Sequence, residues 1–506
     1  MPRPGLLGGA AVAIAFVATC APYLALPPGS DGWKNLWLIG HTAPWQFLHD
    51  PTIAGYAFRF YFEPLWALSF YPDLAFAEWL GAPGYHLVNI AVALVIAWQI
   101  AGFVGRGRAG AAAAALFLAS PVVWFCVAMP TARNYLLGTC LALAAARPYW
   151  NAYRTRRPAT AGAVAGAVAC YALAVASKEA MAALPALLFA LDLRAGRRLP
   201  AALVLMLPFA MALAFLLLWR WHVLGGLGGY FMAPTFVPTN FLAAFPMLGT
   251  LLWGPAAPLG AAALVACAWI VPRRGAAVAI ACLVAALPFV LAGDLAADDL
   301  YPVAAIRLLL AWAWLAVLAG SAAASSASPR LRWASALALL ALLWFQFGQR
   351  PVVDAGVRRA LPIEPIAAAQ ADEPVAIISE ASMALAFEHQ SRRTAKPPLA
   401  AYQSPASFLL DRALGFAPEP DATNHRIRDD WNVPELPPLV LGDSRVWADA
   451  AGHFHAELTP DVARDLTLSW IHVNGPTRWV VTLPVGRTRL ALPVSRSVRA
   501  IVLAKV

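Results

Sequence analysis

The sequence has few charged residues for its length. Only 13% of its 506 residues are Asp, Glu, Lys or Arg, whereas 61% are hydrophobic. A soluble globular domain contains about 25% charged residues, so this composition argues against an ordinary soluble protein. It is typical of a multi-span membrane protein, and the 20 tryptophans fit that class because tryptophan gathers at both membrane interfaces.

The sequence also lacks the cysteine patterns of disulfide frameworks and metal sites. All six cysteines lie in apolar runs: Cys20, Cys126, Cys140, Cys170, Cys267 and Cys282. There is no Walker loop, no GxGxxG before a helix, no HExxH and no GxSxG. There is no repeat with a 34-residue period either. Nucleotide chemistry of the soluble kind and helical repeat arrays are therefore not indicated.

Eleven apolar windows, each roughly 15–22 residues long, run through the first two thirds of the chain and predict membrane helices. The first window follows Arg3 and resembles a signal peptide, but its apolar run of about 20 residues exceeds a signal core. Because further spans follow, we interpret it as a retained first helix. The windows are 6–26, 84–104, 110–128, 132–147, 159–177, 179–193, 200–219, 257–272, 276–293, 302–323 and 332–348.

Arginines are concentrated in the loops that follow even-numbered windows, where Asp192 is the one acid. Cytoplasmic loops are enriched in Lys and Arg, so this bias predicts a cytoplasmic N-terminus and an external C-terminus. The net charge of +10 is then a topology signal, and we expect no nucleic-acid partner. The loop arginines are Arg106, Arg108, Arg147, Arg154, Arg156, Arg157, Arg194, Arg197, Arg198, Arg273, Arg274, Arg330 and Arg332.

Residues 350–506 differ from the rest, because they are rich in Pro, Asp and Arg and contain short β-like runs such as LTLSWIHV and RWVVTLPV. The predicted fold is therefore a polytopic α-helical membrane protein of about eleven spans (1–349) with a small C-terminal external domain (350–506) that is β-rich or mixed. We expect it in a bacterial inner membrane, with the C-terminal domain in the periplasm.

Two charged residues, Lys178 and Glu179, interrupt an apolar stretch, and an ionisable residue in a membrane segment is seldom present without a use. The alternation of loops places this pair in a tight turn at the outer membrane face. The same side receives loop 27–83, in which charged residues alternate with tryptophans. That composition fits a sugar-phosphate site and equally fits amphipathic helices on the membrane surface. The charged residues of the loop are Asp31, Lys34, Asp50, Arg59, Glu63, Asp73 and Glu78.

Charged residues also begin two later windows. Arg133 starts a helix, where the dipole disfavours a cation, which indicates either an anionic partner or a snorkelling side chain. Asp298, Asp299 and Tyr301 begin the tenth window, where capping is the ordinary role of an aspartate. Arg307 follows inside that window, and we expect it to face the bundle interior or a wet cavity. Arg220 and His222 end the seventh window, in positions typical of interfacial anchors.

Taken in order, several of these segments resemble the GT-C superfamily of membrane glycosyltransferases. The resemblance is closest to the protein O-mannosyltransferase branch that includes transmembrane-and-tetratricopeptide-repeat enzymes. Two features depart from that branch: Glu63 stands where an arginine usually precedes the proline, and the C-terminal segment lacks the helical repeats. The similar segments are the acid after the first window (Asp31), YFEPLWALSFYPD with GYHLVNIAVAL, TARNYLLGTCLAL, YALAVASKEAMAALPALLFALDL and DDLYPVAAIRLLL.

The resemblance implies transfer of a sugar from a polyprenyl-phosphate donor to an acceptor hydroxyl, with inversion, outside the membrane. By resemblance Asp31 is the catalytic base, because the acceptor hydroxyl needs a carboxylate to take its proton. Lys178, Arg133 and Arg307 are candidates to bind the leaving phosphate, with Glu179 orienting Lys178. Further substrate-binding candidates are Asp50, Arg59, Glu63, Asp299 and Tyr301.

The identity of the acceptor (protein, glycan or lipid) and a divalent metal requirement stay open, and membrane lipids are expected partners. Two other functions compete with the transferase. A lipid-linked glycan transporter or flippase would favour charges near the bilayer midplane and paired broken helices, whereas most charges here lie at the outer rim. A non-catalytic membrane assembly protein is the other alternative, because Glu63 stands in place of the usual arginine.

Overall fold

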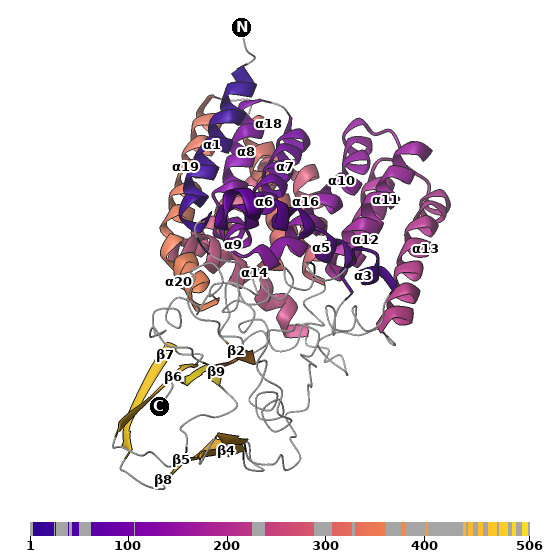
Figure 1. The fold of residues 1–506 in the computed structure, drawn as a ribbon. Helices are drawn as coiled ribbons and strands as arrows, with labels where there is room; N and C mark the ends of the chain where they lie inside the picture. The colour runs from indigo at the N-terminus through magenta and orange to yellow at the C-terminus, as the bar shows by residue number, and fades with distance from the viewer. Residues whose placement is uncertain are drawn as a thin grey trace. The chain divides into compact units, whose positions relative to one another are not determined.

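The computed structural model describes residues 4–24, 26, 39, 43–49, 62–105, 107–224, 238–287, 306–325 and 329–360, and the strands between 376 and 503 (Figure 1). The chain divides into two compact units. The first comprises Met1–Pro27 and Ile39–Val357, and the second comprises Pro28–Leu38 and Arg358–Val506.

The described part of the first unit is helical, which confirms the predicted helical class. Its N-terminal half contains α1 (Pro4–Leu24), α3 (Gln46–His49), α5 (Pro64–Leu68), α6 (Tyr71–Leu80), η1 (Ala82–Tyr85), α7 (Leu87–Val104), α8 (Arg108–Leu118), α9 (Pro121–Ala128), η2 (Pro130–Ala132) and α10 (Arg133–Thr155).

The chain then continues through α11 (Ala161–Ser177), η3 (Glu179–Ala183), α12 (Leu184–Arg194), α13 (Leu199–Leu224), α14 (Pro238–Trp253), η4 (Gly254–Ala256), α15 (Ala257–Ile270), α16 (Pro272–Ala286), α18 (Leu309–Ser325), α19 (Pro329–Gly348) and α20 (Arg350–Ala360).

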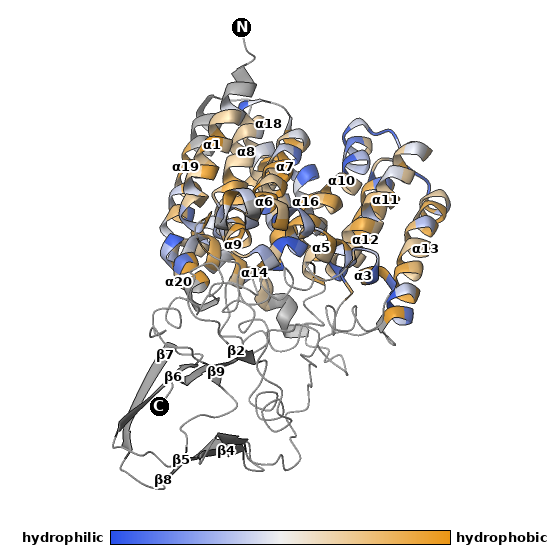
Figure 2. Ribbon diagram, viewed as in Figure 1, coloured by the Kyte–Doolittle hydropathy of each residue, from blue (hydrophilic) through white to orange (hydrophobic). Residues whose placement is uncertain are grey.

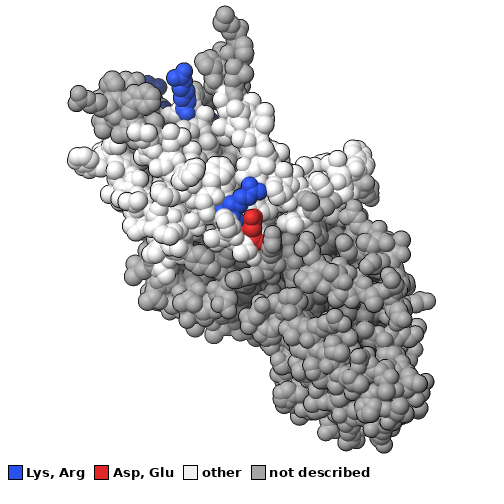
Figure 3. Space-filling model, turned by 90° about the vertical axis from the view of Figure 1, so that its left-hand side faces the viewer, with Lys and Arg blue, Asp and Glu red and all other residues white. Residues whose placement is uncertain are grey.

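Three of the described helical segments are long and apolar enough to cross a membrane: Leu87–Val104, Leu199–Val223 and Ala243–Ile270. A fourth is added if the bent pair Arg108–Leu118 and Pro121–Ala128 is one span. Hydrophobic residues run along most helices of this unit (Figure 2), and one face of the described surface carries few charged side chains (Figure 3). These features fit a helical membrane protein, with fewer long spans than the eleven windows predict.

Helix breaks account for part of this difference. Ser120 caps α9, its hydroxyl accepting a hydrogen bond from Val123 N, and Pro121 occupies the first turn, so window 110–128 becomes two helices bent by 58°. Window 179–193 likewise begins as the 3₁₀ turn η3 and becomes helical only at Leu184. Apolar periodicity alone does not register these local breaks.

The core of the first unit lies where α18 packs between α7, α8 and α16. Phe103, Trp150 and Trp314 form an aromatic cluster there, with ring centroids 5.1–5.8 Å apart. A Cβ at Gly320 would lie 2.6 Å from Ala113 Cβ, so the glycine allows α18 and α8 to approach closely. Small residues at such crossings are typical of helix packing in membranes.

The described strands of the second unit form two sheets, with the orders β2-β1-β9-β6-β7 and β3-β4-β5-β8. The pairings are antiparallel except for the parallel pair β1 and β2. Whether residues 350–506 form a β-rich external domain stays a prediction. The strands are β1 (Ala376–Ser379), β2 (Ala400–Tyr402), β3 (Leu439–Leu441), β4 (Ser444–Ala448), β5 (Phe454–Leu458), β6 (Arg464–His472), β7 (Gly475–Leu483), β8 (Thr488–Ala491) and β9 (Val498–Leu503).

Candidate functional site

Two sets of buried polar side chains meet at the start of α10. Arg133 and Asn134 are its first two residues, and both side chains are buried. Arg133 contacts residues of the α5–α7 region, and Asn134 contacts a residue that also binds Lys178. We call the first group the arginine network (Ser69, Asp73, Tyr85, Asn89 and Arg133) and the second the lysine cluster (Glu63, Asn134, Lys178 and Glu179).

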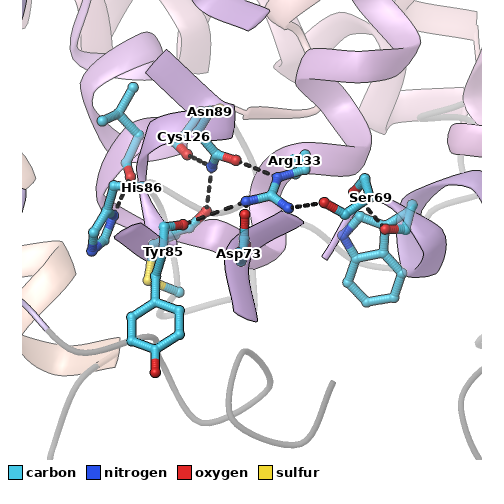
Figure 4. A network of polar contacts seen from close by, with 10 residues as sticks. Ser69, Asp73, Tyr85, His86, Asn89, Cys126 and Arg133 are labelled. Atoms are coloured by element: carbon cyan, nitrogen blue, oxygen red, sulfur yellow. Dashed lines mark hydrogen bonds and ion pairs between the residues drawn. The ribbon is translucent and has the colours of Figure 1, made fainter. Parts of the chain in front are cut away.

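In the arginine network, the fully buried guanidinium of Arg133 donates hydrogen bonds in several directions (Figure 4). Its Nε donates to Asn89 Oδ1 at 2.6 Å and its Nη1 to Ser69 O at 2.6 Å. Its Nη2 forms an ion pair with Asp73 Oδ2 at 2.6 Å and also donates to Tyr85 O at 3.4 Å. The network therefore ties α10 to α6, η1 and α7, and it occupies the guanidinium that the sequence offered for phosphate binding.

Asn89 and His86 extend this network to the end of α9. Asn89 Nδ2 donates to Cys126 O at 2.6 Å, and the two ring nitrogens of His86 lie 2.8 Å from Val127 O and 2.9 Å from Leu26 O (Figure 4). The last carbonyl groups of a helix have no partner within it. The two side chains thus satisfy the end of α9 and hold the chain after α1 against it.

In the lysine cluster, the buried Nζ of Lys178 donates to Glu63 Oε1 at 2.5 Å. It lies 3.4 Å from Glu179 Oε1 and 5.1 Å from the centroid of the Tyr135 ring. Asn134 Nδ2 donates to the other carboxylate oxygen, Glu63 Oε2, at 2.9 Å. Glu63, rather than the adjacent Glu179, is therefore the nearer partner of Lys178.

Local backbone structure explains how these side chains meet. Lys178 ends α11 in an extended conformation, with φ −156° and ψ 119°, so the chain leaves the helix at this residue. Glu63 precedes Pro64, and a residue before proline is disfavoured in the helical region. Gly138 lies in the first turns of α10, where a Cβ would meet Met181 Cγ at 3.2 Å. The glycine lets α10 approach the turn that carries Lys178.

Burial and electrostatic interactions within the lysine cluster move the pKa values of its two carboxyl groups in opposite directions. Burial raises the pKa of Glu63 from 4.5 to about 8, against the opposing charge of Lys178. Desolvation is the largest single effect on Glu179, but Lys178, the hydrogen bonds to the carboxylate and Arg220 together outweigh it and lower its pKa to about 2. The Glu179 side chain keeps 41% exposure, which favours its ionised form. Despite burial, the two carboxyl groups raise the pKa of Lys178 well above 10.5.

At neutral pH the cluster thus holds one cation, one carboxylate and one protonated carboxyl group. Arg220 of α13, 8% exposed, adds positive charge that acts on Glu179 and lowers its pKa further. The sequence suggested an interfacial anchor for Arg220, whereas the structure buries it near the cluster. A desolvated group of titratable residues with separated pKa values is a candidate functional site.

The other predicted site residues have different outcomes. Arg307 is half-buried just before α18 and belongs to neither polar group in the described part of the chain. The remaining predicted site residues lie outside the described residues: Asp31, Asp50, Arg59, Asp299 and Tyr301. Within the described ranges, no three or more His, Cys, Asp or Glu side chains are grouped to hold a metal ion.

Sequence reasoning assigned no role to several residues that the structure places in these groups. Asp73 was considered only as one of the charged residues of loop 27–83. Asn89 and His86 were given no role, although both lie in the segment GYHLVNIAVAL, which resembles the superfamily. The signal was present in each case, because a polar residue within an apolar run indicates a buried partner. The sequence does not reveal which partner each residue has.

Comparison with known proteins gives no match, either to a family model, to a curated protein or to a solved structure.

Proposed function

We propose that the chain is an inverting membrane glycosyltransferase of the GT-C type. It moves a sugar from a polyprenyl-phosphate donor to an acceptor hydroxyl on the external face of a bacterial inner membrane. In this proposal the N-terminus is cytoplasmic and residues 350–506 form a periplasmic domain that is β-rich or mixed.

The observation that supports the proposal is the convergence of four segments that are distant in sequence. Glu63 and Asp73 come from YFEPLWALSFYPD, and Asn89 comes from GYHLVNIAVAL. Arg133 belongs to TARNYLLGTCLAL and Lys178 to YALAVASKEAM. Each segment resembles the corresponding part of the superfamily, and buried polar contacts join the four around the start of α10. Burying and pairing so many polar groups is costly, and this cost supports a functional role for the site.

The chemistry assigns a separate task to each kind of side chain. A carboxylate, which we assign to Asp31, takes the proton of the acceptor hydroxyl as its oxygen bonds to the anomeric carbon. The bond from that carbon to the phosphate oxygen breaks at the same time, and the electron pair leaves with the lipid phosphate. Lys178 stabilises that phosphate charge, while Glu63 and Glu179 hold the ammonium group in position.

The proposal also keeps the other substrate contacts as assigned from the sequence. Arg307 and Arg59 are further cations for the donor phosphate, and Asp50, Asp299 and Tyr301 contact the sugar or the acceptor. Arg133 acts differently from its sequence-based assignment: with its guanidinium buried in the arginine network, it positions α10 and thereby Asn134 and Glu63.

One observation favours a second candidate, a non-catalytic membrane assembly protein. Arg133 is fully buried, and its hydrogen bonds go to groups of the protein itself. A scaffold stabilised by such contacts needs no substrate. The two candidates differ in one measurable property, which is the turnover of a lipid-linked sugar.

The experiment uses the purified full chain in nanodiscs, supplied with a panel of polyprenyl-phosphate hexoses and pentoses. The acceptors are a periplasmic protein extract, a glycan fraction and a lipid fraction. We expect time-dependent release of polyprenyl phosphate with at least one donor and one acceptor class. Release at the protein-free background with every combination overturns the transferase and supports the assembly role.

A further inference from the structure

A second group of cations lies at the other end of α10. This helix runs from Arg133 to Thr155, which is about 34 Å at 1.5 Å per residue, so its C-terminal end is distant from the lysine cluster. Arg154 lies in the last turn of α10, and Arg273 and Arg274 lie in the first turn of α16. None of these arginines has a part in the proposed transfer reaction.

Reciprocal contacts fix the two helix ends against each other. The hydroxyl of Tyr153 donates a hydrogen bond to Arg273 O. Arg273 Nη2 in turn donates to Tyr153 O at 3.2 Å, and its guanidinium lies 4.7 Å from the centroid of the Tyr153 ring. Arg154 Nη1 donates to Phe103 O at 3.4 Å. These contacts therefore hold the backbone that carries the arginines in a fixed position.

Positive charge in this group is not balanced by the described part of the chain. The charged group that acts most strongly on Arg274 is another cation, Arg154. Arg274 Nη1 is buried and has no hydrogen-bond acceptor among the described residues. Asp192, the acid that the sequence places on this side, is already paired with Arg197 at 2.5 Å. An anion bound from outside the protein would stabilise these two neighbouring cations and accept the hydrogen bond of the buried donor.

The surroundings indicate which anion fits. The group lies at the N-terminus of α16, where unpaired backbone N–H groups add positive potential. Next to it, α15 presents Val265 and Trp269, which are 70% and 86% exposed and four residues apart on one helix face. An exposed tryptophan beside cations at the end of an apolar helix pair is typical of the headgroup level of a membrane. A lipid supplies both the anion and the apolar chains for this surface.

We infer that Arg154 and Arg274, between the end of α10 and the start of α16, bind the phosphate of an anionic phospholipid whose acyl chains lie along α15. The lipid phosphate accepts hydrogen bonds from both guanidinium groups and removes their mutual repulsion. No covalent step is involved. Because the site is distant from the lysine cluster, this inference does not depend on the proposed transferase function.

The test compares lipids and matched variants of the full chain in detergent micelles. Phosphatidylglycerol or phosphatidylcholine is titrated while the melting temperature and the bound lipid, by native mass spectrometry, are measured. We expect phosphatidylglycerol to bind more tightly, and Arg274→Gln to weaken that binding by about tenfold, which corresponds to loss of one charge-assisted contact. Arg157→Gln, which removes an exposed arginine from the same side, should bind as the wild type does.

Two results overturn the inference. One is equal binding of phosphatidylglycerol by Arg274→Gln and Arg157→Gln. The other is displacement of the lipid by inorganic phosphate at comparable concentration, which identifies a site for the free ion. If Arg274→Gln does not fold, Arg154→Gln and Arg274→Lys are measured instead. About tenfold weaker lipid binding by Arg154→Gln, together with a smaller loss of binding by Arg274→Lys, supports the site. Unchanged lipid binding by both variants overturns it.

Discussion

Glu63 stands where the enzymes that the sequence resembles usually carry an arginine, and its contacts show how an acid is accommodated there. It is fully buried, it accepts hydrogen bonds from Lys178 and Asn134, and burial raises its pKa to about 8. A protonated Glu63 leaves the charge of Lys178 balanced by Glu179 alone. A glutamate at this position is therefore compatible with the proposed site, because the cation of Lys178 is retained.

Replacing Lys178 tests its role at the residue scale. Lys178→Ala should lower turnover by about tenfold or more, because a charge-assisted contact is worth roughly 1.5–3 kcal/mol. Lys178→Arg should keep part of the activity. Turnover is measured from the release of polyprenyl phosphate at saturating acceptor.

Loss of stability could imitate this effect, because Lys178→Ala leaves the carboxylate of Glu179 without its cation. The double variant Lys178→Met/Glu179→Gln removes both charges together, which is often neutral for stability. We expect it to melt near the wild type and yet to transfer slowly. A stable double variant with wild-type turnover gives Lys178 a purely structural role.

The raised pKa of Glu63 also predicts a pH dependence of stability. Folded Glu63 keeps its proton up to about pH 8, whereas the unfolded chain releases it near 4.5. The folded state therefore binds more protons in this range, and its stability falls as the pH rises through it. Over pH 5–9 the melting temperature of the wild type should fall more steeply than that of Glu63→Gln, which is neutral throughout. Parallel curves for the two proteins contradict the raised pKa.

At the scale of elements, the arginine network joins the start of α10 to α6, η1 and α7. Arg133→Met leaves the buried Asp73 unpaired, and breaking a buried ion pair costs about 3–5 kcal/mol. We expect a clear fall in the melting temperature. Arg108→Met is the matched control, because it removes an exposed arginine from the start of α8. Equal melting temperatures for the two variants return Arg133 to the set of candidate phosphate ligands.

The elements also show where sequence reasoning succeeds and where it ends. Composition and apolar windows predict the helical class, because burying helices in lipid demands such residues. They predict a turn at Lys178 and Glu179 but not that it continues as a 3₁₀ helix to Ala183, and they miss the break at Ser120 and Pro121, because both depend on local capping and backbone geometry. Periodicity also cannot reveal that Glu63 meets Lys178, which lies 115 residues away. That contact is decided by how α5, α10 and α11 pack.

For the whole molecule, the distribution of arginines predicts a cytoplasmic N-terminus and an external C-terminus. A reporter that is active only in the cytoplasm should therefore be silent when fused after Val506. The same reporter fused within the Arg156–Arg157 loop should be active, and it serves as the control. A bright signal after Val506 reverses the topology and moves the lysine cluster to the cytoplasmic side.

We propose that the chain catalyses glycosyl transfer with Asp31 as the base. The rate of sugar transfer by Asp31→Asn in nanodiscs tests this claim, with Asp50→Asn as the matched control from the same loop. Asparagine keeps the size and hydrogen-bonding capacity of the side chain but not its basicity. We predict that Asp31→Asn binds the donor normally and transfers about 10²–10⁴-fold more slowly, while Asp50→Asn, which alters a substrate contact rather than the base, loses no more than about tenfold. Transfer by Asp31→Asn at the wild-type rate contradicts the assignment of the base, and the absence of transfer by the wild type contradicts the claim itself.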